Sequence, residues 1–155
     1  MEITLVRAEI SDAAELLAMQ KRAFSELLER YQDFDTNPAN DTLEKMEARL
    51  RQAESHFYFI CDGPLKAGGL RVVDRREAGR PKRLSPIFVL PEFQGLGIAQ
   101  RAMELCEEIY GTEGWELDTL LEEPKNCYLY EKMGYRRTGR TAVVNDRLTL
   151  VTYRK

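Results

Sequence analysis

Apolar and polar positions repeat with two different periods in the first third of the chain. Residues 2–8 alternate between apolar and polar side chains, and this period of two predicts a strand. From a cap at Ser11 or Asp12 to about Tyr31, apolar residues recur every three or four positions, which predicts a helix that buries one face. A proline-containing break follows, and a second, shorter helix is predicted to open at Asp41.

The middle of the chain contains three runs with strand character. The runs 56–62 and 67–74 are joined by an Asp-Gly-Pro turn, which predicts an antiparallel hairpin. A third run, 85–90, ends at Pro91, which cannot donate to a sheet ladder. The basic stretch 75–83 contains a glycine and a proline, so we interpret it as an exposed loop rather than a phosphate-binding patch.

The last third of the chain contains two more helices and three more strands. Helices are predicted at 98–110 and 124–134, and strands at 115–122, 135–144 and 147–154, the last two forming a hairpin. The whole order is strand, two helices, three strands, helix, strand, helix, two strands. This order predicts a mixed α/β domain in which the connection from 85–90 to 115–122 is a right-handed parallel crossover.

Composition agrees with one folded domain. The 155 residues are 43% hydrophobic, so residues 1–155 are predicted to form a single domain. No segment approaches ~18 consecutive apolar residues, and the start lacks a signal peptide pattern, which predicts a cytoplasmic protein without a membrane partner. A net charge of -3 argues against nucleic acid as a partner. Cys61, Cys106 and Cys127 lack the paired spacing of a metal site, so no metal is expected and the thiols are interpreted as reduced.

Two glycines stand between a predicted strand and a predicted helix, in Gln94-Gly95-Leu96-Gly97-Ile98-Ala99. A dinucleotide fingerprint requires a third glycine where Gln100 stands, and a nucleotide phosphate loop requires lysine followed by serine or threonine at its close. Two interpretations remain. Backbone N–H groups at the helix start hold a pyrophosphate, or the segment is a turn that contains two glycines.

The same six residues match the coenzyme signature [RQ]-x-x-G-x-[GA] of the GCN5-related N-acetyltransferases. A second signature of that family, a short helix, is matched by Asn126 and by Leu129-Tyr130-Glu131-Lys132-Met133-Gly134-Tyr135. The chain resembles this family in both motifs and in its order of elements. The resemblance implies a mostly antiparallel sheet with a splayed parallel pair of central strands, flanked by four helices. It also implies acetyl-coenzyme A as co-substrate; a misread nucleotide-binding fold is the weaker alternative.

The resemblance also implies roles for individual residues. The backbone of Ile87, Phe88 and Val89 would hold the pantetheine arm, and the N–H of Val89 or Leu90 would donate to the thioester oxygen. The other residues expected to bind the coenzyme are Gln94, Gly95, Leu96, Gly97, Ile98, Ala99, Asn126 and Tyr130.

Tyr130 is the candidate general acid, because a phenol with a pKa of ~10 stays protonated at neutral pH. Without the glycine motif it would be interpreted as a buried core residue. Tyr128 is the substitute acid. For the general base, Glu122, Glu92 and a water chain ending on a carboxylate are the candidates, whereas the single histidine, His56, is interpreted as structural.

The acceptor is expected to be a small cationic amine such as a polyamine or aminoglycoside. The segment between the first two helices places acidic residues around Tyr31 and Phe34, which suits a cation; the acidic residues are Glu26, Glu29, Asp33, Asp35 and Asp41. A peptide N-terminus or a protein lysine is the competing acceptor. A non-catalytic acyl-coenzyme A sensor or protein-interaction module is the competing class, the acyl group is acetyl or longer, and homodimers are common among such domains.

Overall fold

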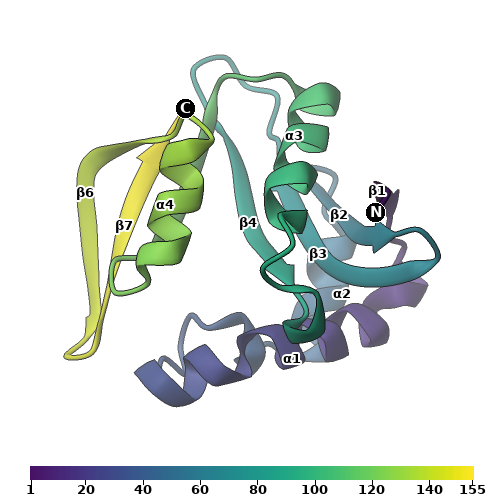
Figure 1. Cartoon of the computed structure of the whole chain (residues 1–155), viewed down its shortest axis with the longest axis horizontal. Coiled ribbons are helices and arrows are strands. Elements are labelled where there is room, and N and C mark those ends of the chain that lie inside the picture. Colours follow the sequence, from purple (N-terminus) through teal and green to yellow (C-terminus); the bar gives the residue numbers. More distant parts are fainter.

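A computed structural model describes residues 1–155. The chain is built around one seven-stranded sheet (Figure 1). The strands are β1 (Ile3–Arg7), β2 (Ser55–Asp62), β3 (Leu65–Val73), β4 (Lys82–Val89), β5 (Trp115–Leu120), β6 (Arg136–Asn145) and β7 (Leu148–Arg154). Their order across the sheet is β1-β2-β3-β4-β5-β7-β6, and only the β4–β5 pair is parallel. The predicted mixed, mostly antiparallel sheet is therefore confirmed.

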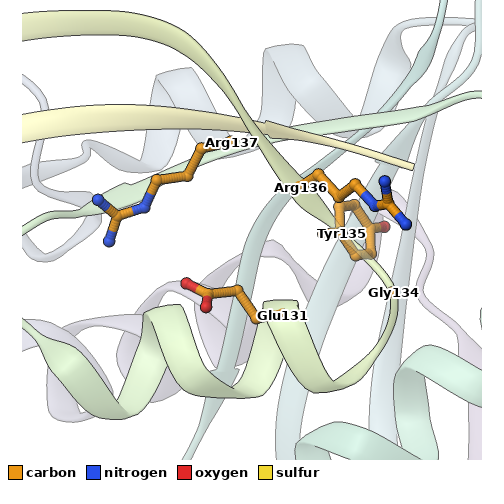
Figure 2. A pocket seen from close by; sticks show the side chains of 5 residues that line it. All are labelled: Glu131, Gly134, Tyr135, Arg136 and Arg137. Carbon is orange, nitrogen blue, oxygen red and sulfur yellow. The ribbon is translucent and has the colours of Figure 1, made fainter.

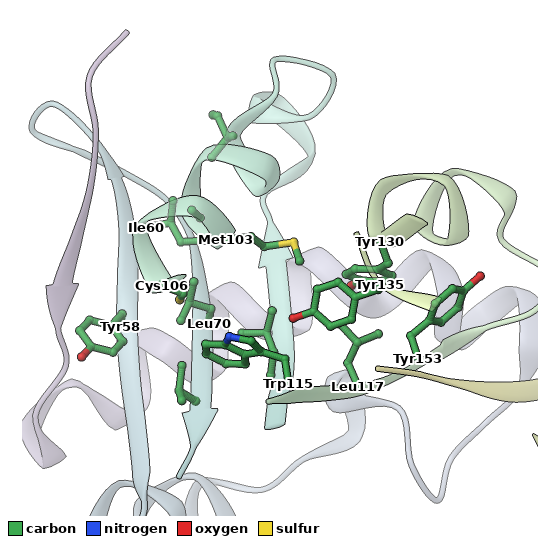
Figure 3. Close-up of a cluster of buried hydrophobic side chains, with 14 of the residues drawn as sticks. Tyr58, Ile60, Leu70, Met103, Cys106, Trp115, Leu117, Tyr130, Tyr135 and Tyr153 are labelled. Carbon is green, nitrogen blue, oxygen red and sulfur yellow. The ribbon is translucent and has the colours of Figure 1, made fainter. Parts of the chain in front are cut away.

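Helices cover both faces of this sheet. They are α1 (Ala13–Tyr31), α2 (Leu43–Arg51), α3 (Ile98–Tyr110) and α4 (Pro124–Lys132), with single 3-10 turns at Ile10–Asp12, Pro38–Asn40 and Pro91–Phe93. The larger core joins α3 and α4 to one face around Trp115, Leu117 and Tyr153 (Figure 3). A smaller core joins α1 and α2 to the other face around Phe57 and Phe88. The order of elements and the bounds of α3 are as the apolar periodicity predicted.

Helix α1 begins directly after Asp12, as predicted, but the Asp12 side chain does not cap it. The carboxylate of Asp12 accepts a hydrogen bond from the N–H of Glu9 at 2.8 Å, so it stabilises the 3-10 turn that precedes the helix. Glu15, three residues after Asp12, pairs with Lys66 of β3 at 2.5 Å. The cap therefore acts one turn earlier than the sequence pattern indicated.

The start of α2 is also corrected. Its N-cap is Thr42, whose hydroxyl accepts a hydrogen bond from the N–H of Lys45 at 3.1 Å. Asp41 was predicted to open this helix, but its carboxylate is buried and accepts bonds from Gln20 and Arg49, each at 2.8 Å. Asp41 therefore ties α1 to α2.

Strand β4 begins three residues before the predicted run. Lys82 and Arg83, assigned from the sequence to a loop, form its first two positions and pair with Trp115 and Glu116 of β5. These are the only paired positions between β4 and β5, so the two strands diverge beyond them. The splayed central pair expected from the family resemblance is confirmed.

The three cysteine side chains lie inside the fold. Cys61, Cys106 and Cys127 are all buried and all free thiols. Burial raises the pKa of Cys106 to about 12 and also raises that of Cys61. None of the helices combines the length and apolar composition needed to cross a bilayer.

Candidate active site between the diverging strands

A cavity of about 380 Å³ occupies the space that opens between β4 and β5. One wall is the β4 segment 84–87, and the other is the β5 segment 118–120. The end of α1 and the turn that follows it contribute a third side, and α4 contributes Asn126 and Tyr130. Elements far apart in the sequence therefore meet at one hollow.

The backbone of β4 leaves donors directed into this opening. The N–H of Leu90 donates to the carbonyl of Ala67 at 2.8 Å, so it belongs to the β3–β4 ladder. Because N–H groups alternate in direction along an antiparallel strand, the N–H of Val89 points away from β3, toward the gap. Of the two N–H groups expected for the thioester oxygen, Leu90 is thus ruled out and Val89 is retained.

The glycine loop leads directly into α3 and has the geometry of an anion cradle. Gly95 and Gly97 have φ angles of 77° and 78°, the left-handed region that favours glycine, and no atom lies within 4 Å of where a Cβ would stand on either residue. The first intrahelical bond runs from the N–H of Arg101 to the carbonyl of Gly97 at 3.1 Å. The N–H groups of residues 98–100 precede that bond, and Gly97 offers them no side-chain cap. The loop therefore fits a pyrophosphate.

Tyr130 lies in α4 with its side chain buried and its edge on the cavity. Its ring packs against Tyr135 and Tyr153, with centroid separations of 6.0 and 6.2 Å (Figure 3). Burial first, and then the neighbouring Cys127, raise the pKa of Tyr130 to about 12. Tyr128, the substitute, is 68% exposed and does not line the cavity. Of the two candidate acids, only Tyr130 therefore lines the cavity.

Two carboxylates line the cavity. Asp118 on β5 accepts a bond from Arg83 at 2.8 Å on one oxygen and from the hydroxyl of Thr152 at 2.6 Å on the other. Asp33, in the turn after α1, is buried and accepts the N–H of Thr36 at 2.9 Å. A carboxylate fixed in this way retains lone pairs for a ligand donor.

The two glutamates considered for the base, and the histidine interpreted as structural, lie elsewhere. Glu122 is exposed beside the cavity, where its carboxylate accepts the N–H of Thr149 at 3.0 and 3.2 Å. Glu92 receives the guanidinium of Arg22 on both oxygens at 2.9 Å; a backbone hydrogen bond and Arg22 lower its pKa. His56 bonds to the hydroxyl of Tyr110 at 2.7 Å, at the far end of α3. None of the three lines the cavity.

Asp118 is the residue at the cavity whose role the sequence analysis missed. A usable signal was present in "WELDTL", where Glu116 and Asp118 alternate with Trp115 and Leu117 on a strand at the centre of the domain. Charged residues in such a strand require partners, and their presence there indicates a site.

Tyr31, one of the residues that line the cavity, is held by contacts between distant segments. Tyr31, at the end of α1, donates its hydroxyl to the carboxylate of Glu123, the residue before α4. Arg30 pairs with the same carboxylate at 2.9 Å, and Asn145 in the β6–β7 hairpin donates to the carbonyl of Tyr31 at 2.9 Å. We call the Tyr31–Glu123 contact and its two supporting bonds the end wall.

A second, more open hollow of about 550 Å³ lies at the other end of α4 (Figure 2). Glu131 and Arg137 face each other across it. The hydroxyl of Tyr153 donates to Glu131 at 2.6 Å and accepts from Arg137 at 3.0 Å, so both charged groups already have a partner. This hollow is separate from the cavity between β4 and β5.

Comparison with known proteins agrees with this geometry. Residues 16–135 match the profile of the acetyltransferase (GNAT) family. Because this match covers most of the chain, the chain belongs to that family. A spermidine N(1)-acetyltransferase of Escherichia coli K12 is 33% identical over 93 residues, which cover 57% of this chain and 48% of that protein. The chain therefore spans about half the length of this relative.

Several solved structures share the fold. An acetyltransferase of Thermus thermophilus superposes with a TM-score of 0.73 at 17% identity, covering 99% of this chain and 96% of the other. The spermidine N-acetyltransferase of Vibrio cholerae, solved with CoA and spermine, gives 0.76 at 17% identity over 97% and 93%. The ribosomal-protein-S18-alanine N-acetyltransferase of Escherichia coli gives 0.72 at 14% identity over 98% and 92%. At these identities the likeness establishes the fold.

Proposed function

We propose that residues 1–155 form one catalytic domain that transfers an acetyl group from acetyl-coenzyme A to a primary amine. The observation that carries this proposal is that the cavity and the glycine loop lie next to each other along the chain, at β4 and the residues that follow it. The strand forms one wall of a cavity that holds Tyr130, and the chain then runs into the open glycine loop at the start of α3. Family membership supports the same assignment.

The chain supplies the coenzyme with backbone donors at two places. The N–H groups at the start of α3, with Gly95 and Gly97 beneath them, favour the pyrophosphate through their unpaired hydrogens and the helix dipole. The backbone of Ile87 and Val89 faces the gap, where it suits the pantetheine arm. The coenzyme supplies the acetyl thioester, and the N–H of Val89 is the donor positioned for its oxygen.

Tyr130 acts as the general acid in this proposal. Its raised pKa keeps the phenol protonated throughout the neutral range, so a proton is available for the departing thiolate. Asn126, one turn earlier on α4 and also at the cavity, suits a coenzyme contact.

Asp118 replaces Glu122 as the proposed carboxylate for the acceptor amine. It is held at the cavity by two hydrogen bonds, whereas Glu122 bonds to the backbone beside it. Because Arg83 and Thr152 already fix both of its oxygens, we assign Asp118 to binding and orienting the ammonium group. The ammonium proton then leaves through water to the solvent.

The acceptor is proposed to be a small cationic amine. The cavity volume of about 380 Å³ favours a small molecule over a folded protein substrate. Asp33 and Asp118 on different walls favour a cation. The name of the Escherichia coli relative, a spermidine N(1)-acetyltransferase, makes polyamines the first compounds to test. A peptide N-terminus is the competing acceptor, and a coenzyme sensor is the competing function.

The test is release of the coenzyme A thiol from acetyl-coenzyme A across polyamines, aminoglycosides, amino acids and amino-terminal peptides. Turnover confined to one amine class names the acceptor. Binding of acetyl-coenzyme A by calorimetry without turnover on any amine would support the sensor. Absence of binding would overturn the coenzyme assignment as well.

A further inference from the structure

The fork between β4 and β5, where the two strands diverge, is bridged by the side chain of Arg83. Only two residue pairs join these strands, and Arg83 is in the second pair, where the strands begin to diverge. Its guanidinium reaches across the fork to two carboxylates of β5, Glu116 and Asp118, the latter at 2.8 Å. A planar guanidinium presents donors in a fixed arrangement, so it fixes the position of both carboxylates at once.

Glu116 anchors the far end of this contact. Its side chain is 6% exposed, and its carboxylate also accepts from Arg154 at 2.7 Å and from Arg140 at 3.1 Å. One buried carboxylate therefore ties together β4, β5, β6 and β7. An arginine attached to such an anchor has little freedom, which makes Arg83 a rigid support for its second carboxylate.

Asp118 is the member of this network that faces the cavity. Its side chain is 37% exposed, compared with 6% for Glu116 two positions earlier on the same face of β5. Arg83 holds one carboxylate oxygen and the hydroxyl of Thr152 holds the other. The remaining lone pairs have a direction set by these two bonds.

We infer that Arg83 is a positioning residue that acts through Asp118 to set the affinity for the acceptor amine. This inference rests on the proposed amine acetylation. It assigns to Arg83 no contact with either substrate. Arg83 keeps the Asp118 carboxylate turned toward the cavity at the point where β4 and β5 separate.

A double-mutant cycle tests this inference. We expect Arg83→Gln to raise the KM for the amine by about tenfold, the usual effect of losing one charge-assisted hydrogen bond, with a smaller change in kcat. Asp118→Asn is expected to raise the same KM by a similar factor. In the Asp118→Asn background, Arg83→Gln should then change KM by less than about twofold, because the residue through which it acts is already altered.

The controls separate positioning from a general effect on the fold. Arg154→Gln removes another donor to Glu116 and has no side-chain bond to Asp118 or Thr152, so the amine KM should stay at the wild-type value. The Kd for coenzyme A should be unchanged in Arg83→Gln, because the glycine loop lies outside this network. Arg83→Lys keeps the charge but cannot bridge two carboxylates, and it should recover only part of the loss.

Several results would overturn the inference. Equal effects of Arg83→Gln in the wild-type and Asp118→Asn backgrounds would show that Arg83 acts independently of Asp118. A parallel loss of coenzyme A binding in Arg83→Gln would show that Arg83 has a structural role alone. If Arg83→Gln does not fold, Arg83→Lys takes its place. A rise in its amine KM that is as large in the Asp118→Asn background as in the wild type has the same meaning. Absence of amine-dependent turnover by the wild-type protein would instead contradict the proposed function.

Discussion

The hydroxyl of Tyr31 donates a hydrogen bond to the carboxylate of Glu123, which joins the last residue of α1 to the residue that precedes α4. These residues lie 92 positions apart in the sequence, and Tyr31 is one of the residues that line the cavity. Selection of the acceptor by length would then depend on a bond to Glu123, a residue that does not itself line the cavity.

Removing this bond should relax selection by length. Tyr31→Phe deletes only the hydroxyl, and Glu123 keeps its pair with Arg30, so the free energy of unfolding should fall by only about 1 kcal/mol. We expect the ratio of kcat/KM for long amines to that for short amines to rise. Steady-state kinetics on a homologous series of diamines measures it, with the exposed Tyr128→Phe as control. An unchanged ratio would show that the end wall does not limit the acceptor.

Tyr130→Phe should separate chemistry from binding. Loss of a general acid commonly lowers kcat by ~10²–10⁴, whereas the Kd for coenzyme A should change little, because the ring and its packing remain. Since burial raises the pKa of Tyr130 to about 12, its active, protonated form persists as pH rises. The kcat of the wild type should therefore show no fall between neutral pH and about pH 10. A decline centred in that range and absent in Tyr130→Phe would contradict the raised pKa, whereas an unchanged kcat in Tyr130→Phe would contradict the assignment of Tyr130 as general acid.

A negative charge in the glycine loop should abolish coenzyme binding. Gly97→Glu places a carboxylate where the proposed pyrophosphate sits, and Gly97→Gln adds the same bulk without the charge. Calorimetry should show weaker binding in Gly97→Gln and a further loss in Gly97→Glu that shrinks as salt increases. Gly79→Ala controls for strain, because Gly79 also has a positive φ, 80°, in open space. Equal losses of coenzyme affinity in the Gln and Glu variants would contradict the proposal that this loop binds the pyrophosphate anion.

Acid should weaken the network around Glu116. Burial alone would raise the pKa of this carboxylate, but the hydrogen bond from Arg154 and the charges of Arg83, Arg154 and Arg140 outweigh burial and lower it. A lowered pKa in the folded state gives stability that is complete above the unfolded value of about 4.3 and is lost as pH falls through the folded value.

The free energy of unfolding should therefore decline on acidification, and Glu116→Gln should decline less steeply. Urea unfolding at about pH 6 and about pH 3.5 measures both slopes. Glu122→Gln, at an exposed carboxylate, is the matched control and should follow the wild type. If the free energy of unfolding declines equally with pH in Glu116→Gln and in the wild type, Glu116 is not the source of the acid sensitivity.

Local features were predictable from the sequence wherever neighbours in the chain determine them. The apolar spacing from Ile98 to Tyr110 gives the bounds of α3, and Gly95 and Gly97 adopt the left-handed conformation that their type favours. Family resemblance added the splayed pair of strands, which periodicity cannot supply.

The predictions that were wrong or missing concern residues whose partners are distant in the sequence. Lys82 and Arg83 were assigned to a loop because they belong to a basic stretch that contains glycine and proline, yet their strand partners lie 33 positions later. Asp118 could not be placed at the cavity before β4 and β5 were known to separate at Arg83. Asp41 illustrates the same limit, because its burial depends on α1 and α2 packing together.

The buried cysteines have a practical consequence for measuring turnover. Because all three thiols are inside the fold and burial suppresses ionisation of Cys61 and Cys106, a disulfide reagent added to the native protein should react with released coenzyme A and leave the protein unmodified. The same reagent would detect three additional thiols once the chain unfolds. A single colorimetric assay can therefore report catalysis in the native enzyme and loss of structure in a destabilised variant.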